Sequence, residues 1–393
     1  MNSAQIETSK SLLGRPTVDM LLQVHEDALW MLENLGVGCA QPDMLAAFQP
    51  YESDGKAIVY QNRVYVTQEL VGECLAKVPG IDDFFVPRNS FFVGGTAPYV
   101  YDDVAGQGGV MPTAADVARI AAIAEASPVV AGMGRGLKLK DEVEQMETMT
   151  AHCSKPMYYA VTTDRALEKA RAIHAQRGRE MVVFCLTRPC LEINENFSDH
   201  FVKVVRAGLP VFISAMPMAG ISAPYCYNGV LTMTHADALF GICAAQVLNP
   251  GITCIHGGYP AIADSQTDDT PNYGLIGHTL ANILMAHLNM MLDLPTCQSA
   301  CTTNEEHLTE RQPVEGIVGC VFGVENVTEA MLIAAGEKSG PSRAAIRVAR
   351  SPLHEPNPVR RYGVDVGRRN FSRSVEPDIG ITEVVRHQYD EVR

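Results

Sequence analysis

The chain has 393 residues, of which 47% are hydrophobic, with 23 Pro and 32 Gly, and this composition is typical of a folded globular protein rather than a disordered or fibrous one. Its 31 basic and 45 acidic residues give a formal net charge of −14, which argues against a broad surface for the phosphate backbone of a nucleic acid. Eleven Cys without regular spacing indicate reduced thiols, and residues 1–13 lack the apolar stretch of a signal peptide, so a cytoplasmic location is expected.

The first 90 residues are predicted to form a small helical cap with a hairpin. Apolar residues recur at helical spacing over 17–35, and Gly36 follows in the position where glycine commonly ends a helix. Residues 57–67 alternate between apolar and polar side chains as a strand does, and residues 69–78 return to helical spacing. We expect this region to cap the domain that follows.

Between residues 91 and 340 the pattern alternates between strand and helix. A strand over 91–101 is followed by six units in which a helix precedes a short apolar strand. The helices are predicted at 113–126, 141–153, 165–176, 196–207, 236–248 and 273–292, and their strands at 129–134, 157–161, 181–186, 211–215, 252–256 and 296–300. Such a series predicts a parallel sheet covered by helices. A doubly wound sheet and a closed TIM (β/α)8 barrel both fit, and the number and spacing of the units favour the barrel.

Three domains are therefore expected. The cap spans 1–90, the (β/α)8 barrel spans 91–340, and an extension spans 341–393, while residues 314–335 add a further helix and strand to the barrel. The extension is rich in arginine and contains several prolines. We interpret it as a surface segment at a subunit contact, so a homo-oligomer is expected.

Residues 207–263 carry one formal charge, Asp237. Charged side chains normally occupy solvated surfaces, so a segment this neutral is expected to be buried. Pro and Gly interrupt each of its apolar runs, whereas a membrane span needs roughly 20 continuous apolar residues. The segment therefore predicts the middle of a large domain, with loops that line a protected cavity.

The carboxyl ends of the predicted strands, where barrel enzymes form their active sites, carry aromatic, amide and small residues. No nucleophile–base pair is evident among them. Seven tyrosines lie near these ends or in glycine-rich loops: Tyr99, Tyr101, Tyr158, Tyr159, Tyr225, Tyr227 and Tyr259. Each alone is typical of a core residue, but as a set around a cavity low in charge they suit a quaternary ammonium held by ring faces.

Other catalytic patterns fit less well. The run 132–136 lacks the glycine spacing of a dinucleotide loop, and Lys155 lies at the start of a strand, the wrong end for a Schiff-base lysine. Cys297 and Cys301 have the wrong spacing for a zinc knuckle. His256 could act as a ligand or as a base, or it could be a core histidine that hydrogen-bonds to the backbone, and the sequence leaves these three interpretations open.

Three motifs resemble the trimethylamine methyltransferase family. They are Gly-Gly-Thr-Ala-Pro-Tyr-Val-Tyr-Asp at 94–102, Ala-Met-Pro-Met-Ala-Gly-Ile-Ser-Ala-Pro at 215–224, and Ala-Gln-Val-Leu-Asn-Pro-Gly at 245–251 followed by His-Gly-Gly-Tyr-Pro at 256–260. The helix around 25–36 is also similar, and the resemblance runs from about residue 18 to about residue 335. It implies a TIM barrel that moves a methyl group from a methylated amine to the cobalt of a partner corrinoid protein.

The chain departs from the family pattern in informative ways. It has no pyrrolysine, so it resembles the members that act on glycine betaine and related quaternary amines, and the arginine-rich extension replaces the family's long C-terminal helical region. Where such members carry an Asp-Met-Arg-Thr run, this chain has Asp-Ser-Gln-Thr at 264–267, which argues against glycine betaine itself. The resemblance implies a cytoplasmic enzyme with a cognate corrinoid partner, with no metal and no tightly bound cofactor of its own.

The candidate substrate-binding residues are Tyr99, Tyr101, Arg135, Tyr159, Arg188, Met218, Tyr225, His256, Tyr259 and Gln266. The ammonium cage is assigned to Tyr99, Tyr159, Tyr225 and Tyr259. Recognition of the rest of the substrate is assigned to Arg135, Arg188, His256 and Gln266, and the loop at 216–224 shapes the mouth. Two alternatives stay open: a zinc-assisted methyltransferase that uses His256 with Cys residues, and a non-catalytic protein that binds a methylated amine.

Overall fold

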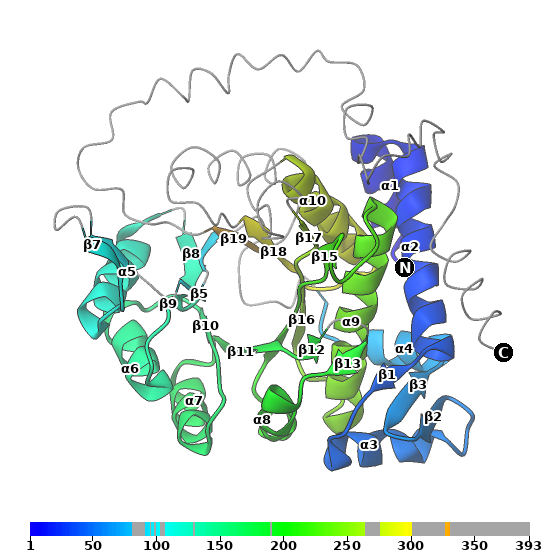
Figure 1. The fold of residues 1–393 in the computed structure, drawn as a ribbon, viewed down its shortest axis with the longest axis horizontal. Helices are drawn as coiled ribbons and strands as arrows, with labels where there is room; N and C mark the ends of the chain where they lie inside the picture. The colour runs from blue at the N-terminus through cyan, green and yellow to red at the C-terminus, as the bar shows by residue number, and fades with distance from the viewer. Residues whose placement is uncertain are drawn as a thin grey trace, which may run out of the picture. The chain divides into compact units, whose positions relative to one another are not determined.

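The computed structural model describes residues 1–80, 91–94, 96–97, 100–102, 107–128, 130–188, 191–263, 276–300 and 327–330 (Figure 1). These residues form a mixed α/β protein around an eight-stranded parallel sheet. The expected extension at 341–393 and most of the predicted pair at 314–335 lie outside the described residues. The expected boundary between barrel and extension therefore remains a prediction.

The N-terminal region contains helices and a β-hairpin. Its elements are α1 (Ser3–Leu13), α2 (Arg15–Asn34), β1 (Val37–Gly38), α3 (Pro42–Phe48), a short 3-10 turn (Gln49–Tyr51), β2 (Ala57–Tyr60), β3 (Arg63–Val66) and α4 (Gln68–Leu75). The strand-like run at 57–67 is this hairpin, because Gln61 and Asn62 adopt φ of 48° and 59° and turn the chain back. Helix α1 was not predicted, since its sequence is polar, although Asn2 caps its first turn.

The strands of the main sheet follow the predicted units closely. They are β4 (Phe91–Val93), β8 (Val130–Met133), β10 (Met157–Tyr159), β11 (Glu180–Cys185), β14 (Val211–Ala215), β16 (Cys254–Gly258), β18 (Cys297–Ala300) and β19 (Val327–Ala330). Their order is β16-β14-β11-β10-β8-β4-β19-β18, so consecutive main-sheet strands are neighbours except β16 and β18, which stand at the two ends of the order. An isolated parallel bridge between His256 and Thr296 links β16 to the residue that precedes β18.

Each predicted helix before a strand is present. The helices are α5 (Ala114–Ala126), α6 (Glu142–His152), α7 (Asp164–Arg177), α8 (Glu195–Arg206), α9 (Tyr227–Leu248) and α10 (Ile276–Met291). Polar side chains at the N-caps start several of them: Thr113 and Asp116 form a capping box on α5, and Asp141 accepts from the first turn of α6. Alternation of amphipathic helices with apolar strands thus produces the sheet with its helical cover.

Helix α9 begins nine residues before the predicted start at 236, because its first turns carry no clean apolar stripe. From Gly229 to Gln246 all but one of its residues are buried, so apolar and small polar side chains occupy its whole circumference. In the part of the chain that the structure describes, α9 alone has the length and composition of a membrane span, but 89% of that window is buried inside the protein. Helix α2 packs along it (Figure 1).

Short strands extend the architecture beyond the main sheet. β12 (Thr187–Arg188) and β13 (Glu192–Ile193) join the N-terminal strands in the order β12-β13-β1-β3-β2. Three further pairs follow main-sheet strands: β5 (Thr96–Ala97) with β9 (Gly136–Leu137), β6 (Val100–Asp102) with β7 (Gln107–Val110), and β15 (Met218–Ala219) with β17 (Ala261–Ile262). The loops after β14 and β16 are therefore joined through β15 and β17.

Candidate functional site

Alternation along the strands divides the buried side chains of the main sheet into two groups. On β10, Met157 and Tyr159 belong to the large core that includes residues of α2 and α5 to α9, whereas Tyr158 belongs to a separate cluster. That cluster comprises Phe92, Ala131, Tyr158, Met181, Val183, Phe212, Ile255, Tyr259 and Cys297. All of its members come from strands or, for Tyr259, from the residue after β16. On this second face the described cluster is thus built from apolar and aromatic side chains of the strands, with none from a helix.

Four rings run across this second face, and we call Phe92, Tyr158, Phe212 and Tyr259 the aromatic cluster. The Phe92 and Tyr158 centroids lie 6.2 Å apart with an interplanar angle of 23°. Tyr158 meets Phe212 edge to face at 5.4 Å, and Phe212 meets Tyr259 at 5.9 Å and 77°. These separations are those of favourable aromatic pairs, which contribute about 0.5–1.5 kcal/mol each beyond area burial. The rings therefore hold one another in place.

Glycines on neighbouring strands make room for these rings. A Cβ at Gly134, which follows β8, would collide with the outer end of the Tyr158 ring, and a Cβ at Gly257 on β16 would collide with Phe212. Glycine in a strand weakens it, and its presence often indicates close approach of another group. The contact with Gly134 places the Tyr158 hydroxyl at the carboxyl end of β8, the same edge of the sheet from which Tyr259 extends.

The tyrosines predicted for the cage are not brought together as a set. Tyr259 belongs to the aromatic cluster, but Tyr159 faces the helices, and burial there raises the pKa of its hydroxyl. Its neighbour Tyr158 occupies the position that the sequence analysis gave to Tyr159. Tyr225 is 53% exposed in the loop after β14, where its ring lies against Gly220. Tyr99, Gln266 and the side chain of Tyr101 lie outside the described residues.

The remaining candidates take different positions. Arg135 is half-buried just after β8, at the carboxyl edge near Gly134. Arg188 is exposed on β12 in the N-terminal sheet, and Met218 is half-buried on β15, where its amide donates to the Ser222 hydroxyl at 2.8 Å. Arg135 is therefore the predicted polar residue whose backbone lies next to Gly134, and its carbonyl accepts from the Gln145 side-chain amide at 3.1 Å.

His256 is a core histidine, one of the interpretations that the sequence left open. It lies on the helix-facing side of β16, fully buried, with Nε2 3.0 Å from Nδ1 of His235 and Nδ1 3.0 Å from Nδ2 of Asn289. Burial lowers its pKa to about 3, so the ring is neutral. Both ring nitrogens are thus engaged, and within the described ranges no three His, Cys, Asp or Glu side chains are placed to bind a metal.

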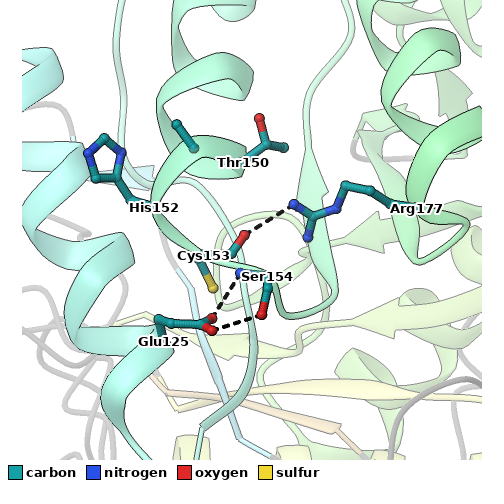
Figure 2. A pocket seen from close by; sticks show the side chains of 7 residues that line it. Glu125, Thr150, His152, Cys153, Ser154 and Arg177 are labelled. Carbon is teal, nitrogen blue, oxygen red and sulfur yellow. Dashed lines mark hydrogen bonds between the residues drawn. The ribbon is translucent and has the colours of Figure 1, made fainter.

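A surface hollow of about 380 Å³ lies at the opposite edge of the sheet (Figure 2). Its lining precedes strands: Cys153 and Ser154 come before β10, and Arg177 comes before β11. Glu125 accepts from the Ser154 amide and hydroxyl at 2.8 Å each, while Arg177 donates to the carbonyls of Cys153 and Lys155. These charged groups stabilise loops at the amino ends of the strands, so the hollow has a structural rather than a catalytic character.

A parallel sheet covered by helices, with an aromatic cluster on one face, is typical of enzymes that bind small organic molecules. The family model of trimethylamine methyltransferase (MTTB) matches residues 16–340, and the chain belongs to this family. The sequence resemblance is therefore confirmed.

Named relatives support the same assignment. Glycine betaine methyltransferase of Desulfitobacterium hafniense strain Y51 is 23% identical over 276 residues, which cover 64% of this chain and 57% of that protein. Trimethylamine methyltransferase MttB of Methanosarcina thermophila is 31% identical over 106 residues, 26% of this chain and 22% of that protein. The MttB of D. hafniense strain DCB-2 is 23% identical over 278 residues, 64% of this chain and 55% of that protein. Similarity to the glycine betaine enzyme supports the predicted non-pyrrolysine subgroup, and the chain spans little more than half the length of these longer matches.

Proposed function

We propose that the chain is a methyltransferase that moves a methyl group from a quaternary, or tertiary, methylated amine to the Co(I) corrinoid of a partner protein. The observation that carries this proposal is the aromatic cluster, in which four rings from different parts of the main sheet contact one another on one face. Aromatic faces attract a quaternary ammonium through their quadrupole, and the attraction grows when water is excluded. Family membership and the names of the relatives support the same class of reaction.

We infer in addition that the main sheet closes into a (β/α)8 barrel. β16 and β18 stand at the two ends of the pairing order, and the bridge between His256 and Thr296 brings them together. The His256 amide donates to the Pro295 carbonyl at 2.8 Å, as expected of adjacent parallel strands. In a closed barrel the face that carries the aromatic cluster is the interior, and its carboxyl end is where barrel enzymes bind substrate.

The chemistry of such a transfer requires no acid or base from the site. As the carbon–nitrogen bond breaks, a quaternary ammonium keeps the electron pair of that bond and leaves as a neutral tertiary amine, so no proton needs to move. The Co(I) corrinoid of the partner supplies the nucleophile. The residues of this chain would bind the cation, exclude water and orient one methyl carbon toward the carboxyl edge. The uncharged lining around Tyr158 and Phe212 is suited to these tasks.

Tyr158 and Tyr259 are the residues that we assign to the cation, because they combine a place in the aromatic cluster with a position at the carboxyl edge. Arg135 is assigned to the rest of the substrate, since it follows β8 at the same edge. The loop at 216–224, which includes Met218, is assigned to the mouth. Roles for Tyr99, Tyr101 and Gln266 remain predictions from the sequence.

A methyl-transfer assay tests the function. The purified chain is mixed with cob(I)alamin and with trimethylamine, glycine betaine, carnitine or choline in turn, and the Co(I) absorbance is followed. At least one amine should consume the Co(I) species faster than buffer does. If an amine binds by calorimetry but no amine changes the corrin spectrum, the chain is a binding protein and the proposed transfer is wrong.

Two variants at one position test the role of the aromatic cluster. Tyr158→Leu removes the ring and should weaken binding of tetramethylammonium by about 1–2 kcal/mol, the scale of a desolvated cation–π contact. Tyr158→Phe keeps the ring and should bind within about twofold of the wild type, because the hydroxyl does not contribute to a cation–π contact. Equal affinities for the Leu variant and the wild type would remove Tyr158 from the proposed site.

A further inference from the structure

Three buried histidines lie in a row between the N-terminal helix and the main sheet. Nδ1 of His25 on α2 is 2.9 Å from Nε2 of His235 on α9, and Nδ1 of His235 is 3.0 Å from Nε2 of His256 on β16. His235 and His256 are fully buried, and His25 is 9% exposed. The row therefore connects α2 through α9 to a strand of the sheet, and we call it the histidine chain.

The neighbours of His256 fix which of its nitrogens carries the hydrogen. The Thr296 hydroxyl donates its single hydrogen to the His256 carbonyl at 2.8 Å, so toward Asn289 this hydroxyl only accepts. The Asn289 atom that lies 3.0 Å from the Thr296 oxygen is therefore the amide nitrogen, and the same nitrogen lies 3.0 Å from His256 Nδ1. The Gly258 amide also points at Nδ1, at 3.3 Å. With donors on this side, His256 Nδ1 is an acceptor and the hydrogen is on Nε2.

This assignment propagates along the histidine chain. His256 Nε2–H donates to Nδ1 of His235, so His235 carries its hydrogen on Nε2 and donates in turn to Nδ1 of His25. All hydrogen bonds then run one way, from Asn289 to α2. A second proton on His235 or His256 would set two donors against each other, so the chain requires neutral rings. Burial lowers the pKa of all three histidines, to about 4 for His25 and to about 3 for His256.

The end of the chain at β16 lies beside the aromatic cluster. The His256 ring packs against Gly258, where an added Cβ would lie 2.8 Å from its Cε1 atom. Gly258 directly precedes Tyr259, whose amide donates to the Ala215 carbonyl at 2.7 Å. The polypeptide backbone that leaves β16 toward Tyr259 is therefore held on one side by the His256 imidazole and on the other side by β14.

We propose that His25, His235 and His256 are positioning residues that form a one-way chain of neutral imidazoles and hold Tyr259 in the aromatic cluster from helix α2. This role deepens the proposed function, because it assigns to the N-terminal helix a part in shaping the amine site. His25 hydrogen-bonds to His235, which bonds to His256 in turn, so His25 acts through these two rings.

The tautomers are measured directly. Long-range 15N–1H correlation spectra of the uniformly labelled whole chain at about pH 7.5 report which nitrogen of each ring carries hydrogen. The expected result is hydrogen on Nε2 in all three histidines, assigned by comparison with single His→Gln variants. Hydrogen on Nδ1 of His256, or a doubly protonated ring in the chain, overturns the proposal regardless of any activity.

The positioning role is tested by removing the last hydrogen bond of the histidine chain, the one between His235 and His25. His25→Leu removes the acceptor for His235, whereas His25→Gln keeps an acceptor oxygen. Ser9→Ala is the matched control, because it removes a buried hydrogen bond of 3.1 Å between α1 and His287 of α10, which is not part of the chain. The readouts are the 13C resonances of the Tyr259 ring, assigned with Tyr259→Phe, and calorimetric titration with tetramethylammonium.

We expect His25→Leu to shift the Tyr259 resonances and to raise the tetramethylammonium Kd roughly threefold to tenfold, with no further rise in a Tyr259→Ala background. His25→Gln and Ser9→Ala should match the wild type. Unchanged Tyr259 resonances in His25→Leu overturn the proposal. If His25→Leu does not fold, the proposal is judged on the tautomers of the wild type and on the Tyr259 resonances of His25→Gln, which should match the wild type. If the wild type binds no ammonium, the proposed function fails, while the tautomers and the Tyr259 resonances still test the chain.

Discussion

Acid should destabilise the protein through the histidine chain, and the size of the effect can be worked out for His25. Burial lowers the pKa of His25 from 6.5 to about 4, so between these values the unfolded chain binds a proton that the folded chain does not. Unfolding therefore takes up a proton as the pH falls, and the stabilising contribution of the neutral ring, complete above about pH 6.5, declines as the pH falls toward 4. Between about pH 7.5 and 5.5 the loss is about 1.4 kcal/mol for one such histidine.

The measurement compares two chains so that other groups cancel. Equilibrium urea unfolding gives the free energy of unfolding for the wild type and for His25→Gln at about pH 7.5, 6.5 and 5.5. The wild type should lose about 1.4 kcal/mol more than the variant over this range. Ser9→Ala, which removes a buried hydrogen bond but no titratable group, should show the wild-type pH dependence. If the free energies of unfolding of the wild type and His25→Gln differ by the same amount at all three pH values, His25 has the same pKa in the folded and unfolded states. The proposal that His25 belongs to a buried chain of neutral imidazoles would then be wrong.

Three further predictions concern single positions. Gly134→Ala should displace the Tyr158 ring and cost about 1–3 kcal/mol of unfolding free energy, with weaker tetramethylammonium binding; an unchanged melting temperature would contradict the close approach. Burial raises the pKa of the Asp237 carboxyl to about 8, so between pH 4 and 8 unfolding releases its proton, and the free energy of unfolding falls by about 1.4 kcal/mol per pH unit. Asp237→Asn should remove this pH dependence, as measured by urea unfolding at several pH values. Tyr225→Ser should leave amine affinity within about twofold, since the ring is 53% exposed, but slow transfer to the partner's corrinoid more than transfer to free cob(I)alamin; equal slowing of both would remove it from the mouth.

The order of helices and strands could be predicted because local patterns determine it. Helices followed by apolar strands of three to six residues produced the six repeated units, and the structure contains each of them. Helix α9 started earlier than predicted because a helix buried on all sides lacks the polar face that marks helical spacing. The polar helix α1 was missed for the converse reason, since it buries little more than Ser9.

The candidate site was harder to predict, because it depends on which side chains of a buried strand face the helices and which face the opposite side of the sheet. In a parallel sheet with both faces covered, Met157, Tyr158 and Tyr159 are all buried, so the sequence offers no polar residue to mark the outside. Alternation shows that the two tyrosines face opposite ways, but register with β8 and β11 decides which one joins the aromatic cluster. The glycine at 134 was the available signal, because a strand end without a side chain indicates that a large neighbour approaches it.

His256 illustrates the same limit for polar groups. In the sequence, His235 lies 21 residues before His256, and His25 lies 210 residues before His235. No local motif therefore connects the three histidines. A buried histidine needs hydrogen-bond partners, yet the sequence cannot say whether a metal, a substrate or another side chain provides them. Here the His235 imidazole and the Asn289 amide provide them, which removes His256 from the substrate list and assigns it to the support of the strand from which Tyr259 extends. The neutral segment 207–263 thus has two proposed functions: one face supplies Phe212 and Tyr259 to the aromatic cluster, and the other supplies His235 and His256 to the polar network that supports Tyr259.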